Sequence, residues 1–209
     1  MEPSTYPVTF SVEYPERQLN RLTTFFRIVT VIPIAIVAQL LQDSGFATGN
    51  YAYVYATAFA GGGLIVMPIV LMLLFRKKYP RWWFDWNLEL TRFLSRIGIY
   101  LALMDDRYPS TDEQQSVHLH YPDPTTQELE RGMPLVKWLL AIPHYIVLFV
   151  LFIGVFFAVI GAWFAILVTG RYPRAIFGFV EGVSRWSHRV SGYAYTLVTD
   201  EYPPFRLKP

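Results

Sequence analysis

The chain has 209 residues, of which 53% are hydrophobic, 17% aromatic and only 16% charged. Soluble proteins carry more charge, and here the apolar residues form a few long runs, which predicts an all-α integral membrane protein. The chain contains no cysteine, which excludes disulfides and thiolate chemistry, and its net charge of +2 gives no sign of a nucleic-acid-binding protein.

Two short segments alternate in polarity as β-strands do. Val8, Phe10 and Val12 share one face near the N-terminus, and Val117 and Leu119 share a face further along the chain. We expect two short cytoplasmic strands, which either pair with each other or offer an edge to a partner chain.

Two apolar runs in the first half predict transmembrane helices at about residues 22–41 and 51–75. The stretch between them is polar and contains glycine, so we expect a helical hairpin. Arg27 lies near the start of the first run, from where its side chain can reach the lipid headgroups. The glycines at 61–63 lack the Lys-Ser/Thr of a phosphate-binding loop, so we expect them to allow close helix packing or a bend.

The apolar run of the second half, residues 138–168, contains no charged residue. As one straight helix it would be about 46 Å long, which exceeds a hydrocarbon core of about 30 Å. We therefore predict two transmembrane helices, at about residues 135–152 and 155–168, with one long tilted helix as the alternative.

Each half continues with an amphipathic helix, at about residues 81–103 and 174–198. In both, arginines recur at helical spacing opposite a face rich in tryptophan and other apolar residues. Such a helix lies in the headgroup layer, or packs its apolar face on the protein's own helices. The residues that we expect to contact lipid headgroups are Arg81, Trp82, Trp83, Trp86, Arg92, Arg96, Arg174, Arg185, Trp186 and Arg189.

These elements recur in the same order in residues 1–109 and 110–209. Seven of the 14 tyrosines precede a proline, and six of these Tyr-Pro pairs stand at matching places in the two halves. We interpret the chain as a tandem repeat, each unit having two transmembrane helices and one amphipathic interfacial helix. Because each unit crosses the membrane an even number of times, the two repeats should be parallel.

The basic residues indicate the orientation. They precede the first hairpin, separate the hairpins or follow the second one, and none lies in a hairpin loop. By the positive-inside rule, we expect a multi-pass protein with both termini in the cytoplasm.

Few ionisable groups lie at membrane depth. His144 is titratable and lies well inside a predicted helix, where it either contacts a ligand or lipid, or bonds a backbone carbonyl, which we favour. His118 and His120 share a strand face without a third ligand, so we predict no metal site and no cofactor.

Two carboxylates recur before Tyr-Pro pairs, Asp106 in the first half and Asp200 in the second. We expect each of them to cap a turn or to pair with an arginine of the preceding amphipathic helix, Arg96 or Arg189.

Several motifs of the second half suggest a family: Ile-Pro-His at 142–144, Thr-Gly-Arg-Tyr-Pro at 169–173, Arg-Trp-Ser-His-Arg at 185–189 and Asp-Glu-Tyr-Pro-Pro-Phe at 200–205. This half resembles the bacterial membrane proteins grouped as domain of unknown function 4389, and the first half matches them more loosely. The resemblance implies a bacterial inner-membrane protein of tandem repeats. It supplies no catalytic residues.

The abundance of interfacial aromatics and the few polar groups at depth favour a non-enzymatic scaffold or accessory subunit. Its partners would be membrane lipids and other membrane subunits or a second copy, and not nucleic acid. The alternative is a small transporter or channel for lipid or another apolar solute, working between the repeats.

Overall fold

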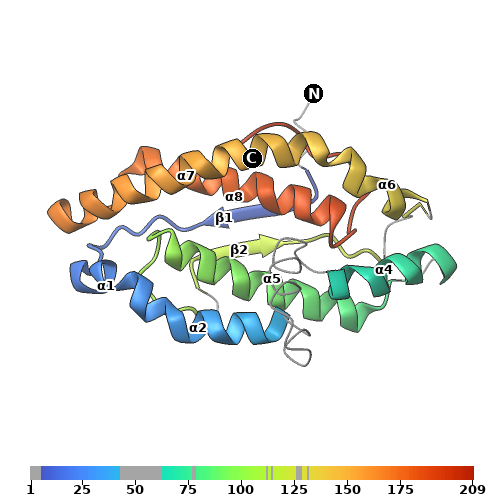
Figure 1. Ribbon diagram of the computed structural model, residues 1–209, viewed down its shortest axis with the longest axis horizontal. Coiled ribbons are helices and arrows are strands. Elements are labelled where there is room, and N and C mark those ends of the chain that lie inside the picture. Colours follow the sequence, from blue (N-terminus) through green and yellow to red (C-terminus); the bar gives the residue numbers. More distant parts are fainter. Residues whose placement is uncertain are drawn as a thin grey trace, which may run out of the picture.

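The computed structural model describes residues 6–42, 63–76, 79–111, 113, 115–125, 129–130 and 132–209. This part of the chain is mostly helical, with seven helices and two short strands. Figure 1 shows that α2, α5, α7 and α8 all run roughly along the longest axis of the molecule. The elements are β1 (Thr9–Val12), α1 (Arg21–Phe25), α2 (Arg27–Gln42), α4 (Gly63–Arg76), α5 (Arg81–Leu101), β2 (Val117–His120), α6 (Met133–Leu140), α7 (Ile142–Thr169) and α8 (Arg174–Ala194).

The two predicted strands form, and they pair with each other. β1 and β2 make an antiparallel sheet in which Phe10 lies opposite Leu119 and Val12 lies opposite Val117. These four side chains are buried, whereas the side chains that alternate with them are exposed, as the period of two predicts. The sheet therefore joins the beginning of the first half to the beginning of the second.

The two predicted amphipathic helices, α5 and α8, begin and end alike. Pro80 and Pro173 occupy the position before each helix with the same ψ of 126°. The proline ring fixes φ near the value that this position has, so proline fits here without strain. After each helix a buried leucine takes a positive φ, 63° at Leu103 and 55° at Leu197. This conformation is uncommon for leucine, and it turns the chain back in both halves.

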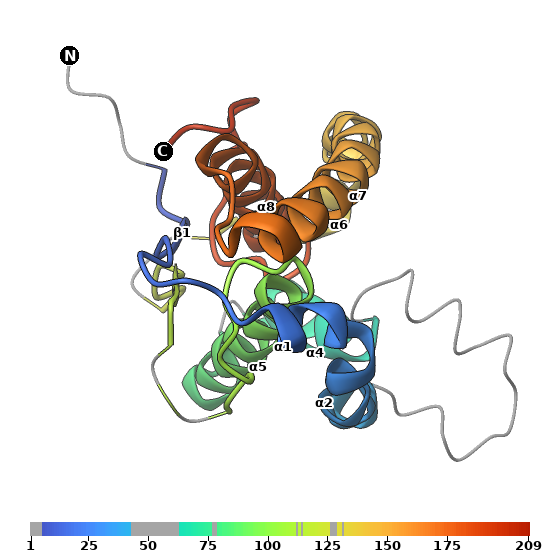
Figure 2. The same cartoon turned by 90° about the vertical axis from the view of Figure 1, so that its left-hand side faces the viewer.

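The elements are arranged in layers. Figure 2 shows β1 on one side of the molecule, α2 and α7 on the opposite side, and α5 and α8 between them. Along this direction α7 packs on α8, α2 packs on α5, and the strands pack on α8 and α5. The largest buried cluster lies where the strands meet the amphipathic helices, and it includes Val8, Phe10, Leu119, Phe177 and Val180.

The apolar run of the second half is one long helix, so the prediction of two crossing helices at about residues 135–152 and 155–168 is wrong. The short helix α6 ends at Leu140, and α7 then continues without interruption to Thr169, a length of about 42 Å. The break falls just before Pro143, because proline has no N–H to donate to the preceding turn and its ring clashes with the carbonyl four residues earlier. α7 ends at Gly170, which adopts the left-handed conformation with φ of 73°.

Two glycines inside α7 lie within the continuous helix and face α8. A Cβ atom on Gly154 would lie 3.3 Å from the ring of Phe179, and one on Gly161 would lie 3.9 Å from Ile176. Both partners belong to α8. At Gly154 the missing side chain lets the two helices approach closely, whereas the distance at Gly161 is an ordinary van der Waals contact. The glycines therefore mark helix packing, and the long-helix alternative is the one the structure has.

Among the described residues, α7 is the one helix long and apolar enough to cross a membrane, and α2 is apolar but shorter. The predicted helix at 22–41 is divided into α1 and α2 at Phe26, and Asn20 caps α1 with its side chain. Of the predicted helix at 51–75, residues 51–62 lie outside the described residues, as do residues 43–50 of the predicted loop. Within the described part, the tandem repeat of two crossing helices is not seen.

Candidate functional site

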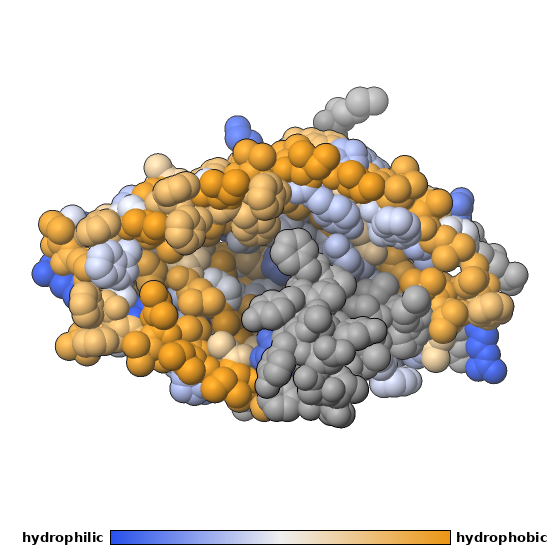
Figure 3. All heavy atoms as spheres, viewed as in Figure 1, coloured by the Kyte–Doolittle hydropathy of each residue, from blue (hydrophilic) through white to orange (hydrophobic). Residues whose placement is uncertain are grey.

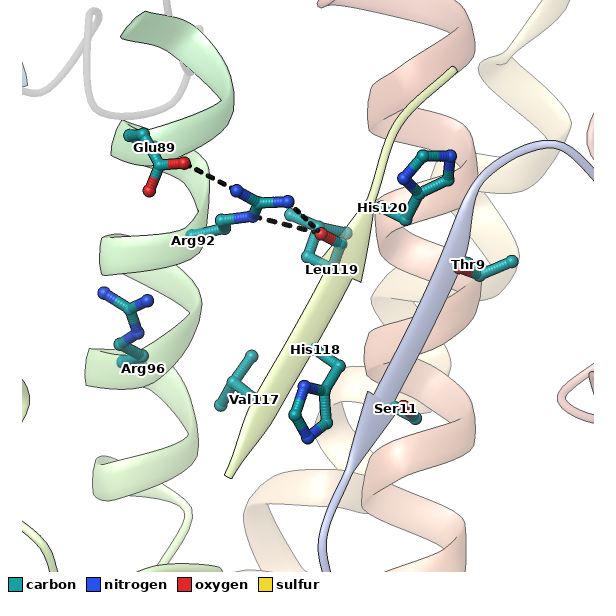
Figure 4. A pocket seen from close by; sticks show the side chains of 9 residues that line it. All are labelled: Thr9, Ser11, Glu89, Arg92, Arg96, Val117, His118, Leu119 and His120. Carbon is teal, nitrogen blue, oxygen red and sulfur yellow. Dashed lines mark hydrogen bonds and ion pairs between the residues drawn. The ribbon is translucent and has the colours of Figure 1, made fainter. Parts of the chain in front are cut away.

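Equivalent arginines on α5 and α8 bind the two strands. The Nε and Nη2 atoms of Arg92 donate to the carbonyl of Leu119 at 3.1 and 3.0 Å, as Figure 4 shows. The Nε of Arg185 donates to the carbonyl of Phe10 at 2.8 Å. Phe10 and Leu119 are opposite each other in the sheet, so the sheet is held from both of its edges. Each helix binds the strand that begins the other half of the chain.

A second pair of arginines binds the segments that follow the helices. The Nη1 of Arg96 donates to the carbonyl of Ser110 at 2.9 Å. The Nη1 of Arg189 donates to the carbonyls of Arg206 and Lys208 at 3.3 and 3.1 Å. Both guanidinium groups are buried, and main-chain carbonyls satisfy part of their hydrogen-bonding capacity.

The C-terminal tail, residues 203–208, lies against α8. Arg185 donates from Nη1 to the carbonyl of Leu207 at 2.9 Å, and Gly182 leaves the space that Leu207 needs, because a Cβ there would lie 2.9 Å from the Leu207 Cβ. At the corresponding position of α5 stands Glu89, whose carboxylate accepts from Arg92 Nη1 at 2.5 Å. A carboxylate on α5 thus takes the place that the tail carbonyl has on α8.

Two buried cations hold the turns after the amphipathic helices. Arg27, 2% exposed, lies over the ring of Tyr100 and donates to the carbonyl of Asp105 at 3.1 Å. Lys137, 1% exposed, lies over the ring of Tyr193 and donates to the carbonyl of Thr199 at 2.7 Å. The expectation that Arg27 reaches the headgroups is therefore wrong.

Lys137 is not among the residues predicted from the sequence, although the sequence carries a signal for this pair of cations. Arg27 stands six residues before Pro33, and Lys137 stands six residues before Pro143. The matching Ile-Pro pairs could have placed the two cations at equivalent positions. Burial lowers the pKa of Lys137, and Asp200 at 2.5 Å opposes this shift.

α5 and α8 meet at another pair of matching residues. Ser95 Oγ lies 3.1 Å from His188 Nε2, and the ring of His188 lies 4.5 Å from that of Phe10. Burial lowers the pKa of His188 to about 4. His188 is therefore neutral at physiological pH and joins both helices to β1.

A pocket of about 440 Å³ lies between α5 and the exposed face of the sheet. Figure 4 shows Arg92 reaching across it from α5 to the strand. Much of its charge is already paired, because Arg92 binds Glu89 and His118 lies 2.9 Å from Glu13. The polar side chains that line it are Thr9, Ser11, Glu89, Arg92, Arg96, His118 and His120.

His144, predicted to contact either a ligand or lipid, or a backbone carbonyl, is fully buried. Its Nδ1 accepts a hydrogen bond from Trp186 Nε1 at 3.1 Å, and its ring stacks on Phe205 at 4.0 Å. Tyr202 lies beside it at 4.9 Å between ring centroids. In this structure His144 attaches the C-terminal tail to α7 and α8.

The ten residues predicted to contact headgroups fall into three groups. Arg81, Trp82, Trp86 and Arg174 are exposed, and Trp83 and Arg92 are partly buried. The other four are buried, which corrects their prediction: Arg96, Arg185, Trp186 and Arg189. The reason is that the arginine faces of α5 and α8 meet main-chain carbonyls of the same chain, which the helical pattern alone does not reveal.

The expected pairing of the recurrent aspartates with these arginines is also wrong. Asp106 forms an ion pair with Arg17 and accepts from the backbone N–H of Asn20. Asp200 pairs with Lys137 and accepts from the N–H of Glu130 at 2.8 Å. Each aspartate thus ties its turn to the segment that leads into the first helix of its own half.

The apolar side chains gather on the face away from β1. Figure 3 shows them along α7 and along α1 and α2. On α7 they are Ile146, Phe149, Val150, Ile153, Phe156, Phe157, Phe164 and Val168, and on α1 and α2 they are Leu22, Phe25, Phe26, Ile28, Val29, Ile32, Ile36 and Leu40. An exposed apolar surface of this extent is a site for lipid or for a protein partner.

The described part of the chain is mostly helical, and one of its helices, α7, is long and apolar enough to cross a membrane. Residues 133–206 match the family described as Domain of unknown function (DUF4389). The match confirms the resemblance of the second-half motifs and covers α6, α7, α8 and most of the tail. Comparisons with curated proteins and with solved structures gave no match.

Proposed function

We propose that this protein is a non-enzymatic membrane scaffold that serves as an accessory subunit of a larger membrane complex. The observation that carries the proposal is the separation of polar and apolar groups. The buried cations bind carbonyls and carboxylates of the same chain, whereas α7 and α2 present apolar side chains on the surface. Such a molecule uses its charges to fix its own shape and its surface to contact lipid and other subunits.

In this proposal the protein resides in the bacterial inner membrane, and its two halves derive from a duplication. Matching contacts support the duplication: Arg92 and Arg185 bind the two strands, and Arg27 and Lys137 bind the two turns. Several crossings with both termini in the cytoplasm are one way to place this scaffold in the membrane. Embedding from one side is the other.

Native mass spectrometry of material released from membranes in mild detergent tests the scaffold role. We expect an assembly of defined stoichiometry, heavier than the 24.2 kDa of one chain. A photo-crosslinking residue in place of Trp82, which is 67% exposed, should join the protein to one fixed species. The same residue in place of the fully buried Val183 is the control and should give no such product.

A chain that runs alone in both measurements contradicts the accessory role. Reconstituted liposomes then distinguish the alternative. Protein-dependent lipid movement or solute flux, above the rate of protein-free vesicles, would favour the transporter that the sequence suggests as second function.

A further inference from the structure

We propose that the protein is embedded in the membrane from one side, with α7 and α2 lying along the membrane plane inside a single leaflet. This inference rests on the proposed membrane location and specifies how the location is achieved. In this position the exposed apolar face contacts the acyl chains of one leaflet.

The apolar face has the shape that such a position needs. On α7, exposed residues recur every three or four positions from Ile146 through Phe156 to Val168, so they form a stripe along almost the whole helix. On α2 a similar stripe extends from Ile28 to Leu40. Figure 2 places α7 and α2 on the same side of the molecule, opposite β1, and Figure 3 shows apolar side chains along both helices.

The opposite face of α7 is covered along its length by α8, which runs antiparallel to it. Near the start of α7, His144 contacts Trp186, and near its middle Gly154 faces Phe179. Two residues beyond Phe179, the carboxylate of Glu181 accepts from the N–H of Val12 at 3.2 Å. The middle of α7 is therefore level with the strand β1.

Polar groups on the sheet lie at the same level. Glu13 follows Val12, and its carboxylate lies 2.9 Å from Nε2 of His118, with both side chains more than half exposed. If α7 crossed the membrane with Gly154 near the centre, this pair would face hydrocarbon. Ionisable side chains exposed at that depth are strongly disfavoured.

The in-plane position removes this conflict. When α7 and α2 lie within one leaflet, α8 and α5 lie nearer to the headgroups, and the sheet faces water because Figure 2 shows β1 on the far side. Exposed arginines also lie at the start of α1 (Arg21), at the end of α4 (Arg76) and just after α7 (Arg171). Their charge is complementary to anionic headgroups.

Depth measurement with spin labels tests this inference on the full chain. The protein has no cysteine, so single cysteines can carry a label at exposed positions of α7: Ile142, Phe149, Phe156, Phe164 and Val168. The labelled proteins are reconstituted in vesicles of phosphatidylcholine and phosphatidylglycerol, and depth is read from accessibility to oxygen and to a water-soluble nickel complex. Circular dichroism confirms that each variant keeps the native helix content.

We expect all five labels at the same depth. A crossing helix would instead give a V-shaped profile, deepest at Phe156, with the labels at both ends about 20 Å closer to water. That profile would overturn the in-plane position and leave the membrane scaffold in place. Labels that are all accessible to the nickel complex, in a protein that does not float with vesicles, would overturn both.

Discussion

Arg185 joins α8 to β1 of the first half and to the C-terminal tail. It is buried and donates to the carbonyls of Phe10 and Leu207 and to the carboxylate of Glu181. In the variant Arg185→Leu, the carboxylate loses its cationic partner and both carbonyls lose a donor. Breaking a buried ion pair on one side costs about 3–5 kcal/mol, so we expect the free energy of unfolding to fall by about this amount.

Thermal unfolding in mild detergent, followed by circular dichroism, measures the effect. A loss of this size lowers Tm by roughly 6–20 °C in a chain of this length. Arg92→Leu is the matched control, because the side chains of Arg92 and Glu89 are 30% and 57% exposed and water can replace the lost contacts, so we expect about 1–2 kcal/mol. Equal losses in both variants, or a loss below about 1 kcal/mol for Arg185→Leu, would refute the reasoning.

Three further predictions concern other contacts. Gly182→Ala should lower the free energy of unfolding by about 1–3 kcal/mol because the new Cβ meets the C-terminal tail. Gly178 has nothing within 4 Å, so Gly178→Ala should raise the free energy of unfolding by up to about 1 kcal/mol. Calorimetry giving the same sign for both variants would contradict this. The depressed pKa of His188, about 4, means that only the unfolded chain binds the proton between about pH 6.5 and 4, so stability should fall by at most about 3 kcal/mol as the pH decreases through this window. His188→Gln should lose this dependence, and an unchanged pH profile would argue against it. Lys137→Met should lower the free energy of unfolding by about 3–5 kcal/mol because it leaves the Asp200 carboxylate without its cation. In the double variant Lys137→Met/Asp200→Asn, urea unfolding should show that part of this stability is recovered. No recovery would rule out this explanation.

Local patterns predicted the parts of the fold that depend on neighbouring residues. Alternation at Phe10 and Val12 identified β1, and the helical spacing of Arg92 and Arg96 identified α5. These patterns succeed because the period of side chains follows directly from the backbone geometry of strands and helices. The mostly helical content follows in the same way from the long apolar runs.

The partners of the polar side chains could not be predicted in this way. Amphipathicity shows which face of α8 is apolar, but it does not show whether Arg185 meets water, lipid or the carbonyl of Phe10, which lies 175 positions earlier in the chain. The apolar run at 138–168 was ambiguous for another reason. Length alone cannot distinguish two crossing helices from one long helix that packs against α8.

The exchange of strands between the halves determines when the protein can complete its fold during synthesis. β1 is translated first, but its partner strand comes more than 100 residues later, and the arginine that binds its carbonyl comes later still. Contacts between such distant segments form slowly. Until β2 has left the ribosome neither edge of β1 has its partner, and the outer edge, which Arg185 and Glu181 bind, waits until α8 has followed. An unpaired strand edge invites association with other chains. The nascent chain is therefore most in need of protection by chaperones or the membrane surface before α8 is made.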